Sequence, residues 1–333
     1  MKILIAGGAG FIGSTIASAC TDSGITPVVV DNLVTGRREF TQGRTFYEGD
    51  ISDGALIDQV FAEHPDIQAV IDCAALIVVP DSVADPLGYY RENVAKGIQF
   101  LEHLVRNDCP RLIFSSSASI YRADAGDFSV DENSDIEPLS PYARTKAIFE
   151  TVLRDVAAAG TLRVISLRYF NPIGADPQLR SGLQIRRPTH ALGKMIDVHH
   201  TGEPFTVTGT DWPTRDGSGI RDYVHVWDLA AAHVKAVQRF DDVTRPDPYR
   251  VINLGTGDGT TVRELLAAFA AVTGHELPTA ETGPRPGDAA GAYTRSHLAQ
   301  ELLGWKPELT VEDGIRDSLR WYAERDTVLG SGG

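Results

Sequence analysis

Three evenly spaced glycines near the start of the chain constrain its fold more than any other feature. Gly7, Gly10 and Gly13 follow a strand-length apolar run at residues 3–6 and open a helical pattern at residues 12–23. Glycine permits a tight turn after a strand, a close approach of backbone to pyrophosphate, and close packing of helix on strand. A strand, glycine turn and helix in this order predict a dinucleotide-binding unit.

Apolar runs and helical patterns then alternate through the first half of the chain. We expect buried strands at residues 3–6, 28–30, 69–73, 112–115 and 164–167. Helices are expected between them at residues 12–23, 55–63, 89–106 and 142–159. This alternation predicts an α/β fold with a Rossmann-type, doubly wound parallel sheet.

The regular alternation of strand and helix patterns ends at about residue 170. Residues 171–187 are rich in Pro, Gly and Arg and are interpreted as a loop. Further patterns predict helices at 188–200, 226–240, 262–272, 297–303 and 311–322, and strands at 205–208 and 250–254. We therefore expect a cofactor-binding domain at 1–170 and a smaller mixed α/β substrate lobe at 171–330. Residues 210–260 are expected to return in part to the first domain.

Charge and composition narrow the class of partner. The 333 residues carry a net charge of −14, which disfavours binding to nucleic acid. Cys20, Cys73 and Cys109 have neither a disulfide framework nor metal-ligand spacing, so no metal is expected. No apolar run has bilayer-spanning length, and residues 2–6 lack the long apolar core of a signal peptide. These features predict a cytoplasmic protein without a membrane partner.

The glycine loop and the end of the second strand form the expected cofactor site. Phe11 and Ile12 lie at the helix N-terminus, where free N–H groups and the helix dipole attract phosphates. Asp31 stands eighteen residues after Gly13, with Asn32 beside it. A carboxylate there accepts hydrogen bonds from an adenosine ribose and repels a 2′-phosphate, which favours NAD over NADP. A turn or cap aspartate is the alternative reading.

Later positions extend this cofactor site. Asp50 and Ile51 follow the next strand, and Asp50 is expected to face the adenine. Ala74 and Ala75 follow the 69–73 strand and are counted among the cofactor contacts. Asn93 is also counted, although a plain surface residue is the equal alternative.

A phenol and an ammonium form the expected chemical site. Tyr142 and Lys146 are spaced i and i+4, so they share one face of a helix. A free phenol has a pKa near 10, and we expect the Lys146 ammonium and a positive nicotinamide to lower it by roughly three units, which takes about 4 kcal/mol. Ser117 follows a predicted strand at its carboxyl end, where such sheets bind ligands. A polar loop with a helix cap is the alternative for Ser117.

Together these residues resemble the extended short-chain dehydrogenase/reductase family. Within it, the sequence is similar to the UDP-galactose 4-epimerase (UDP-glucose 4-epimerase) group, and the likeness covers nearly the whole chain. Its specific motifs are Tyr-Phe-Asn-Pro at 169–172, Gly-Thr-Asp-Trp-Pro-Thr at 209–214, the run at 216–226, and Arg-Pro-Gly-Asp at 285–288.

The resemblance implies roles for residues of these motifs. It places Tyr169 at the nicotinamide, and Asn171, Arg221 and Arg285 at the diphosphate of a UDP-sugar substrate. It places Asp288 at a ribose hydroxyl. Two arginines on a diphosphate are chemically reasonable because the guanidinium fork matches phosphate oxygens.

The same resemblance implies an isomerase activity. A UDP-sugar is expected to be inverted at C4 through a transient 4-keto sugar, with NAD retained throughout. The family also implies a homodimer, in which helices 89–106 and 142–159 pair with their symmetry mates. Sequence leaves open that these helix faces belong to the core.

Several positions depart from the epimerase pattern. Ile77 stands where that group carries a lysine, and Arg186 and Arg187 lie in the loop that faces the sugar. A hexuronate carboxylate would pair with such an arginine, so a UDP-glucuronate 4-epimerase is a variant hypothesis; the alternative is that both face water. Ala292 is small at the position that sets sugar-pocket size, which predicts room for a bulkier sugar.

Rival functions share the cofactor motif. A sugar-nucleotide 4,6-dehydratase needs an extra acid and base beside the serine, and residues 118–120 are Ala-Ser-Ile. A decarboxylase of the same family fits the C-terminal motifs less well. A non-catalytic NAD-sensing protein has no need for Ser117, Tyr142 and Lys146 together.

Overall fold

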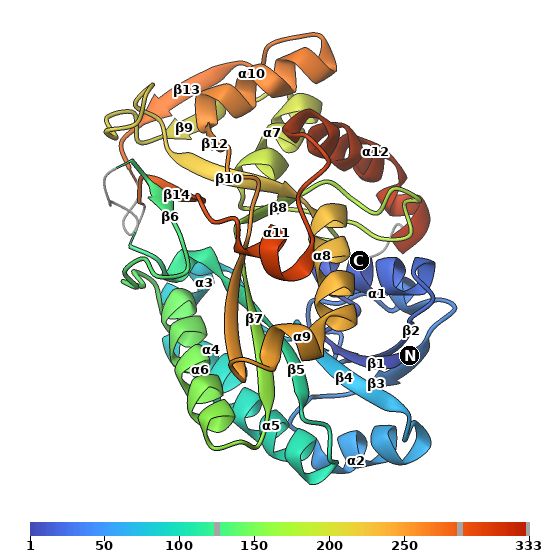
Figure 1. Cartoon of the computed structure of the whole chain (residues 1–333). Coiled ribbons are helices and arrows are strands. Elements are labelled where there is room, and N and C mark those ends of the chain that lie inside the picture. The colour runs from blue at the N-terminus through green and yellow to red at the C-terminus, as the bar shows by residue number, and fades with distance from the viewer. Residues whose placement is uncertain (123–126, 285–288, 331–333) are drawn as a thin grey trace.

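A parallel seven-stranded sheet forms the centre of the molecule (Figure 1). The computed structural model describes residues 1–122, 127–284 and 289–330. Within these residues the strand order is β11-β7-β5-β4-β1-β2-β3. The strands are β1 (Lys2–Ala6), β2 (Thr26–Asp31), β3 (Thr45–Glu48), β4 (Ile67–Asp72), β5 (Arg111–Ser117), β7 (Arg163–Tyr169) and β11 (Tyr249–Leu254). The predicted α/β class is thus confirmed.

Helices cover both faces of this sheet, which explains the continuous apolar runs of its strands. Successive side chains of β1 alternate between two hydrophobic clusters. Ile3 and Ile5 pack on the side of α1 (Phe11–Asp22) and α8 (Val226–Gln238). Leu4 and Ala6 pack on the side of α2 (Gly54–Glu63), α5 (Lys96–Arg106) and α6 (Pro141–Ala158) (Figure 1).

The helix expected at residues 89–106 is divided. It consists of α4 (Pro86–Tyr90), a π-helical turn at Arg91–Ala95, and α5. Such a turn inserts one extra residue into the helix and is frequent at functional sites. Here it contains Asn93, whose side chain is buried.

The C-terminal lobe contains strands that the sequence did not predict. The expected loop at 171–187 is wrong at its start, because Asn171–Ile173 forms β8, which pairs in parallel with β10 (Ile220–His225). Three residues that include a proline carry too little pattern to predict a strand. The other strands of the lobe are β6 (Ser129–Val130), β9 (Phe205–Thr208), β12 (Gly259–Thr261), β13 (Thr279–Thr282) and β14 (Gly291–Thr294).

Six further α-helices lie in the described residues. They are α3 (Val79–Ala84), α7 (Ala191–Thr201), α9 (Phe240–Thr244), α10 (Val262–Thr273) and α11 (Leu298–Leu303), followed by the long α12 (Val311–Leu329). β11 follows several strands of this lobe in the sequence, but it lies in the large sheet beside β7. The division of the chain at residue 170 stays a prediction.

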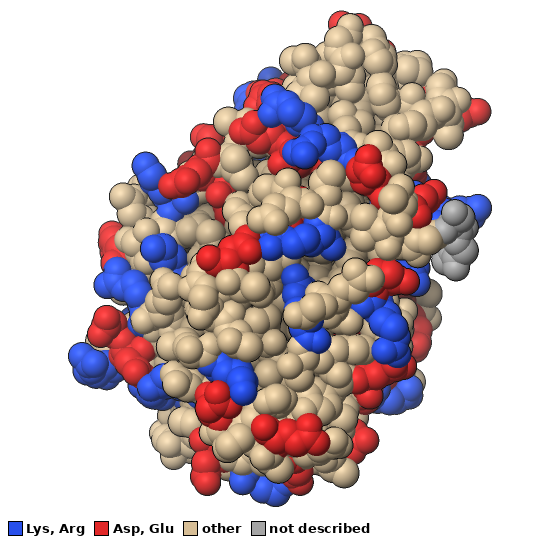
Figure 2. Space-filling view, turned by 90° about the vertical axis from the view of Figure 1, so that its right-hand side faces the viewer, with Lys and Arg blue, Asp and Glu red and all other residues tan. Residues whose placement is uncertain are grey.

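The surface of the molecule carries charges of both signs. Figure 2 shows acidic and basic side chains interspersed on one face. Over residues 1–122, 127–284 and 289–330, every helix is too short or too polar to cross a bilayer.

A buried ion pair joins α6 to β7. The Arg168 guanidinium donates two hydrogen bonds to the Glu150 carboxylate, at 2.9 and 2.6 Å, and both side chains are almost fully buried. Arg168 also donates to the Tyr121 hydroxyl at 2.8 Å, and that hydroxyl donates to Asn253 Oδ1 at 2.6 Å. Ser116, at the end of β5, donates to the same carboxylate. The network therefore connects β5, α6, β7 and β11.

Removing one charge of this pair should destabilise the fold strongly. Glu150→Gln leaves the Arg168 charge buried without its counter-ion, which typically costs about 3–5 kcal/mol. We expect this loss in urea unfolding followed by circular dichroism. Asp58→Asn, which removes the exposed partner of Arg106, is the control and should change the midpoint far less. Equal midpoints for the two variants would contradict the assignment.

Candidate active site

The glycine loop forms a cradle that matches a pyrophosphate. Gly7 has a φ of +72°, and a Cβ on it would lie 2.8 Å from the Ala74 nitrogen. A Cβ on Gly13 would lie 2.2 Å from the Gly7 carbonyl oxygen, whereas one on Gly10 meets that oxygen only at 3.5 Å. Gly10 is the N-cap of α1 and provides no side-chain cap. The loop therefore packs tightly against the protein at Gly7 and Gly13 and leaves space at Gly10. The backbone amides of Phe11, Ile12 and Gly13, at the start of α1, are available there to bind phosphate oxygens.

The Asp31 carboxylate is held in a fixed orientation at the end of β2. Its Oδ2 accepts a hydrogen bond from the Ala9 nitrogen at 2.9 Å, and its Oδ1 accepts one from Leu33 at 2.8 Å. Burial raises the pKa of Asp31, while these two amides lower it. A Cβ on Gly36 would lie 2.6 Å from Oδ1, so the loop after β2 closes tightly around the carboxylate. This placement fits a carboxylate that receives ribose hydroxyls.

Asp50 and Asn32 meet beside this position. Asn32 Nδ2 donates to Asp50 Oδ2 at 3.2 Å, and Lys96 Nζ donates to the same oxygen at 2.7 Å. Burial raises the pKa of Asp50, but hydrogen bonds from Lys96 and Ser52 outweigh it and lower the pKa to about 2. Ile51 is buried in the cluster that contains Leu4.

Asn93 connects the segment after β4 to α6. It accepts a hydrogen bond from the Leu76 nitrogen at 2.8 Å and donates to the Leu76 oxygen at 2.9 Å. It also donates to Thr145 Oγ1 at 3.1 Å. The alternative that Asn93 is a plain surface residue is therefore wrong. Through Leu76, the Asn93 side chain holds the segment that follows β4. This segment begins with Ala74 and Ala75, and Ala74 lies next to Gly7.

Ser117 and Tyr142 lie where β5 ends and α6 begins. Pro141 occupies the first turn of α6, and the Ser140 hydroxyl caps it by accepting from the Ala143 nitrogen at 3.2 Å. Burial raises the pKa of Tyr142, whereas a side-chain hydrogen bond with Ser117 lowers it. Ser117 therefore lies near the phenol, and its hydroxyl donates to Ser119 Oγ at 2.9 Å. A shared action of Ser117 and Tyr142 on one substrate hydroxyl stays a prediction.

The Lys146 ammonium is directed at the backbone of β5. Its Nζ donates to the Ser115 carbonyl oxygen at 2.7 Å and lies 4.7 Å from the centre of the Phe114 ring. Burial lowers the pKa of Lys146 to about 8, and the carboxylates of Asp72 and Glu150 act in the opposite direction. Desolvation of the phenol is the dominant effect on Tyr142 and raises its pKa, so the expected lowering, which also needs the positive nicotinamide, stays a prediction.

Tyr169 takes part in a buried network behind Lys146. Its hydroxyl lies 2.8 Å from Ser115 Oγ and hydrogen-bonds to His233 Nε2. Ser115 Oγ also donates to Cys73 Sγ at 3.0 Å. Sequence analysis missed Ser115 and His233, because a serine inside a strand and a histidine inside a helix resemble ordinary core residues.

The residues expected at the substrate lie on neighbouring strands. Asn171 begins β8 opposite Tyr223 of β10, and Arg221 on β10 faces Ala292 of β14 in register. Arg221 Nη1 donates to the carbonyl oxygens of Ile220 and Ala290, both at 2.7 Å. The other two predicted contacts, Arg285 and Asp288, lie outside the described residues.

The loop with Arg186 and Arg187 is attached to the C-terminal helix. Arg186 Nη2 lies 3.1 Å from an Asp326 carboxylate oxygen and donates to the Gly330 carbonyl at 3.3 Å. Sequence analysis did not foresee this ion pair, because the partner on α12 lies 140 residues later. A role of Arg186 at the sugar stays a prediction. Arg187 is exposed.

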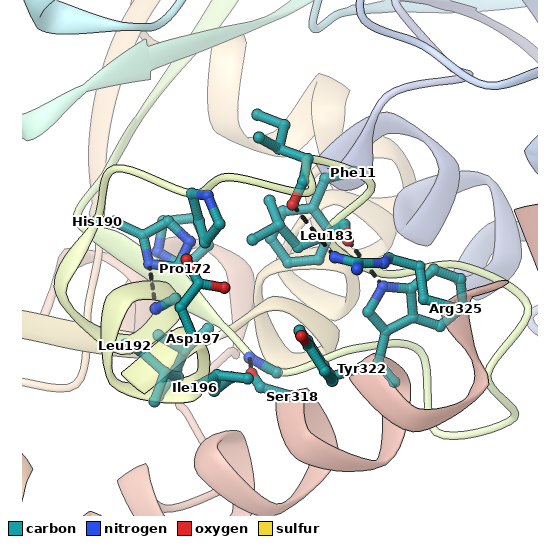
Figure 3. A pocket seen from close by; sticks show the side chains of 16 residues that line it. Phe11, Pro172, Leu183, His190, Leu192, Ile196, Asp197, Ser318, Tyr322 and Arg325 are labelled. Atoms are coloured by element: carbon teal, nitrogen blue, oxygen red, sulfur yellow. Dashed lines mark hydrogen bonds between the residues drawn. The ribbon is translucent and has the colours of Figure 1, made fainter. Parts of the chain in front are cut away.

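A small cavity lies behind that loop, between α7 and α12 (Figure 3). Phe11 and Pro172 line it, and Figure 3 shows Asp197 and Arg325 on opposite walls. Its volume is about 30 Å³, which is room for a water molecule or two rather than for a nucleotide. Within the described parts of the chain, no three His, Cys, Asp or Glu side chains are grouped to hold a metal ion.

Comparison with known proteins gives a consistent result. Residues 3–255 match the model of the NAD dependent epimerase/dehydratase family. A UDP-glucose 4-epimerase of Azospirillum brasilense is 38% identical, with 100% of this chain and 95% of that protein covered. The UDP-glucose 4-epimerase of Bacillus subtilis (strain 168) is 39% identical, with 97% of each covered.

Solved structures resemble the chain over almost its full length. A UDP-glucose-4-epimerase from Stenotrophomonas maltophila, with bound NAD and formylated UDP-arabinopyranose, has a TM-score of 0.91 and 34% identity, with 98% of this chain and 99% of that one covered. The enzyme from Bifidobacterium longum, in complex with NAD+ and UDP, has a TM-score of 0.90 and 33% identity, with 98% and 100% covered.

The cradle geometry predicts the effect of an added methyl group. Gly13→Ala places a Cβ against the Gly7 carbonyl, so the loop has to shift at a cost of about 1–3 kcal/mol. We expect a lower melting temperature and less NAD in the purified protein, measured by chromatography after denaturation. Gly283→Ala meets nothing within 4 Å and is the matched control. Wild-type NAD content in Gly13→Ala would contradict the role of the cradle.

Proposed function

Because this chain belongs to the NAD dependent epimerase/dehydratase family, we propose that it is an NAD-dependent UDP-sugar 4-epimerase. One observation carries the proposal: Ser117 ends β5 and Tyr142 lies in the first turn of α6, so the two meet at the carboxyl edge of the sheet, with Lys146 one helical turn after Tyr142. The carboxyl edge is where such sheets bind ligands. The reaction inverts C4 of a UDP-hexose through a transient 4-keto sugar.

The chain's own residues supply a complete NAD site. The amides at the start of α1 receive the pyrophosphate, and Asp31 receives the adenosine ribose and disfavours a 2′-phosphate. Asn32 and Asp50 lie at the adenine end, and Asn93 holds Ala74 and Ala75 in place. When bound, NAD supplies the hydride acceptor and donor and a positive charge.

Tyr142 is the proposed base and acid. Its phenol takes the proton of the C4 hydroxyl and later returns one, while Ser117 orients the same hydroxyl. Because burial raises the pKa of Tyr142, the phenolate depends on positive charge from Lys146 and the nicotinamide. The phenol is therefore activated by the assembled complex.

Substrate binding is proposed at the strands of the C-terminal lobe. Asn171, Arg221 and Arg285 are assigned to the diphosphate and Asp288 to a ribose hydroxyl. Anchoring at the nucleotide leaves the sugar free to present either face, and binding energy remote from the reacting carbon can serve catalysis. The proposed sugars are glucose and galactose. The UDP-glucuronate variant stays an alternative that rests on Arg186 and Arg187, and a hexuronate carboxylate would have to compete with Asp326 for Arg186.

We also propose a homodimer formed through α5 and α6. Ile98 and Val105 lie seven residues apart on one face of α5 and are 36% and 39% exposed. Ile148 on α6 is 41% exposed. Apolar faces on neighbouring helices are typical of subunit interfaces. A cytoplasmic location stays a prediction.

Removal of the Tyr142 hydroxyl should abolish epimerisation. Tyr142→Phe eliminates the proton transfer, which typically contributes about 10²–10⁴-fold to the rate. We expect kcat for UDP-galactose to fall in this range, with NAD content and melting temperature near those of the wild type. Tyr249→Phe, at the opposite end of the sheet, is the control. Undiminished turnover in Tyr142→Phe would exclude the mechanism.

Charge on the α5 face should separate the subunits. The double variant Ile98→Asp with Val105→Asp places two carboxylates in the proposed contact, where desolvation is costly. Sedimentation equilibrium should then give the mass of one chain, and the mass of two chains for the wild type. Val34→Asp, at a residue 71% exposed elsewhere on the molecule, should remain dimeric. A wild-type protein of single-chain mass would refute the dimer.

A further inference from the structure

Asp72 is a buried carboxyl group that the mechanism above does not use. It ends β4 and is only 3% exposed. Its Oδ1 accepts a hydrogen bond from the Ala74 nitrogen at 3.0 Å, which fixes the direction of the side chain. An isolated carboxylate is costly to bury, so a charged partner is expected nearby.

A cation on the same side of the sheet is the Lys146 ammonium. Asp72 is paired in register with Phe114 of β5, and Lys146 Nζ lies over the Phe114 ring and bonds to the next carbonyl, Ser115. The two charges act on each other: Asp72 raises the pKa of Lys146, and Lys146 lowers that of Asp72. The net pKa of Asp72 is nonetheless raised by burial to about 6.

Other ionisable groups around Lys146 cannot replace this counter-charge. Burial raises the pKa of Cys73 to about 12, so the thiol is neutral. Glu150 is already bound through both oxygens to Arg168. The pKa of Tyr142 and that of Tyr169 are both raised by burial, so both phenols are neutral at pH 7. Of the two carboxylates that act on Lys146, Asp72 and Glu150, only Glu150 is bound to an arginine. Asp72 is therefore the carboxylate available to Lys146.

We propose that Asp72 is a positioning residue, whose carboxylate keeps the Lys146 amine protonated and directed toward the ends of β4 and β5. The proposal rests on the proposed function insofar as Lys146 serves catalysis. Asp72 acts through Lys146, because an amine this deeply buried would otherwise lose its proton as the pH rises above neutrality.

The sign of the pH effect follows from these charges. The pKa of Lys146 is about 8, and loss of a nearby negative charge lowers it. The ammonium would then be lost at a lower pH, and activity would decline earlier on the alkaline side. Below about pH 6, Asp72 itself is protonated in the wild type, so its removal should matter little there.

Asp72→Asn tests the proposal with little change of shape. The amide oxygen can still accept from the Ala74 nitrogen, and only the charge is removed. Asp228→Asn is the matched control, because Asp228 is equally buried, accepts two amides from Glu308 and Leu309, and lies outside the site. Melting temperature and NAD content of each purified variant report on folding.

Two measurements are made on each protein. The first is the 13Cε chemical shift of Lys146 across pH 6–10, measured by NMR in protein labelled at lysine and assigned by the signal lost in Lys146→Arg. This shift follows protonation of the amine, needs no substrate and does not require a reagent to reach the buried group. The second is kcat for UDP-galactose over the same pH range.

We expect the midpoint for Lys146 to fall by about one pH unit in Asp72→Asn and to stay unchanged in Asp228→Asn. The alkaline limb of kcat should shift likewise, giving about eightfold slower turnover at pH 8.5 and little change at pH 6. An unshifted midpoint, or a uniform loss of rate at every pH, would overturn the proposal. If the wild type converted no UDP-sugar, the proposed function would fail, and the midpoint of the Lys146 titration alone would decide the role of Asp72.

Discussion

The buried pair of Arg168 and Glu150 is the interaction on which the arrangement of this molecule depends. It binds α6 to β7 and reaches the end of β5 through Ser116, one residue before Ser117. Glu150 follows Lys146 by one helical turn. A buried charge pair tolerates little displacement, because both ions lose their compensation when they separate. The serine on the strand and the tyrosine on the helix therefore keep a fixed relation to each other.

The central sheet could be predicted from sequence because its strands are buried on both faces. Such strands appear as continuous apolar runs, and residues 28–30 and 69–73 are clear examples. The lobe's strands were harder to predict. β8 is three residues long and contains Pro172, and β10 is stabilised by partners from three separate parts of the chain, which are β8, β12 and β14. Pairing between such distant segments leaves no periodic signal in either one.

Candidate site residues were predictable where their motifs are local. The glycine turn and the spacing of Tyr142 and Lys146 each lie within a few residues, and the structure brings them to one edge of the sheet. Electrostatics was not predictable in the same way. The raised pKa of Tyr142 depends on burial, and the partner of Arg186 is Asp326, far away in sequence. Both are properties of the folded chain as a whole.

The return of β11 to the large sheet has a consequence for how the protein is made. During synthesis, the outer edge of β7 stays uncovered until Tyr249–Leu254 has left the ribosome, after much of the lobe has emerged. An open strand edge is a template for pairing with other chains. The nascent protein is therefore vulnerable to aggregation while about a quarter of its length is made, and it offers chaperones a defined segment to shield.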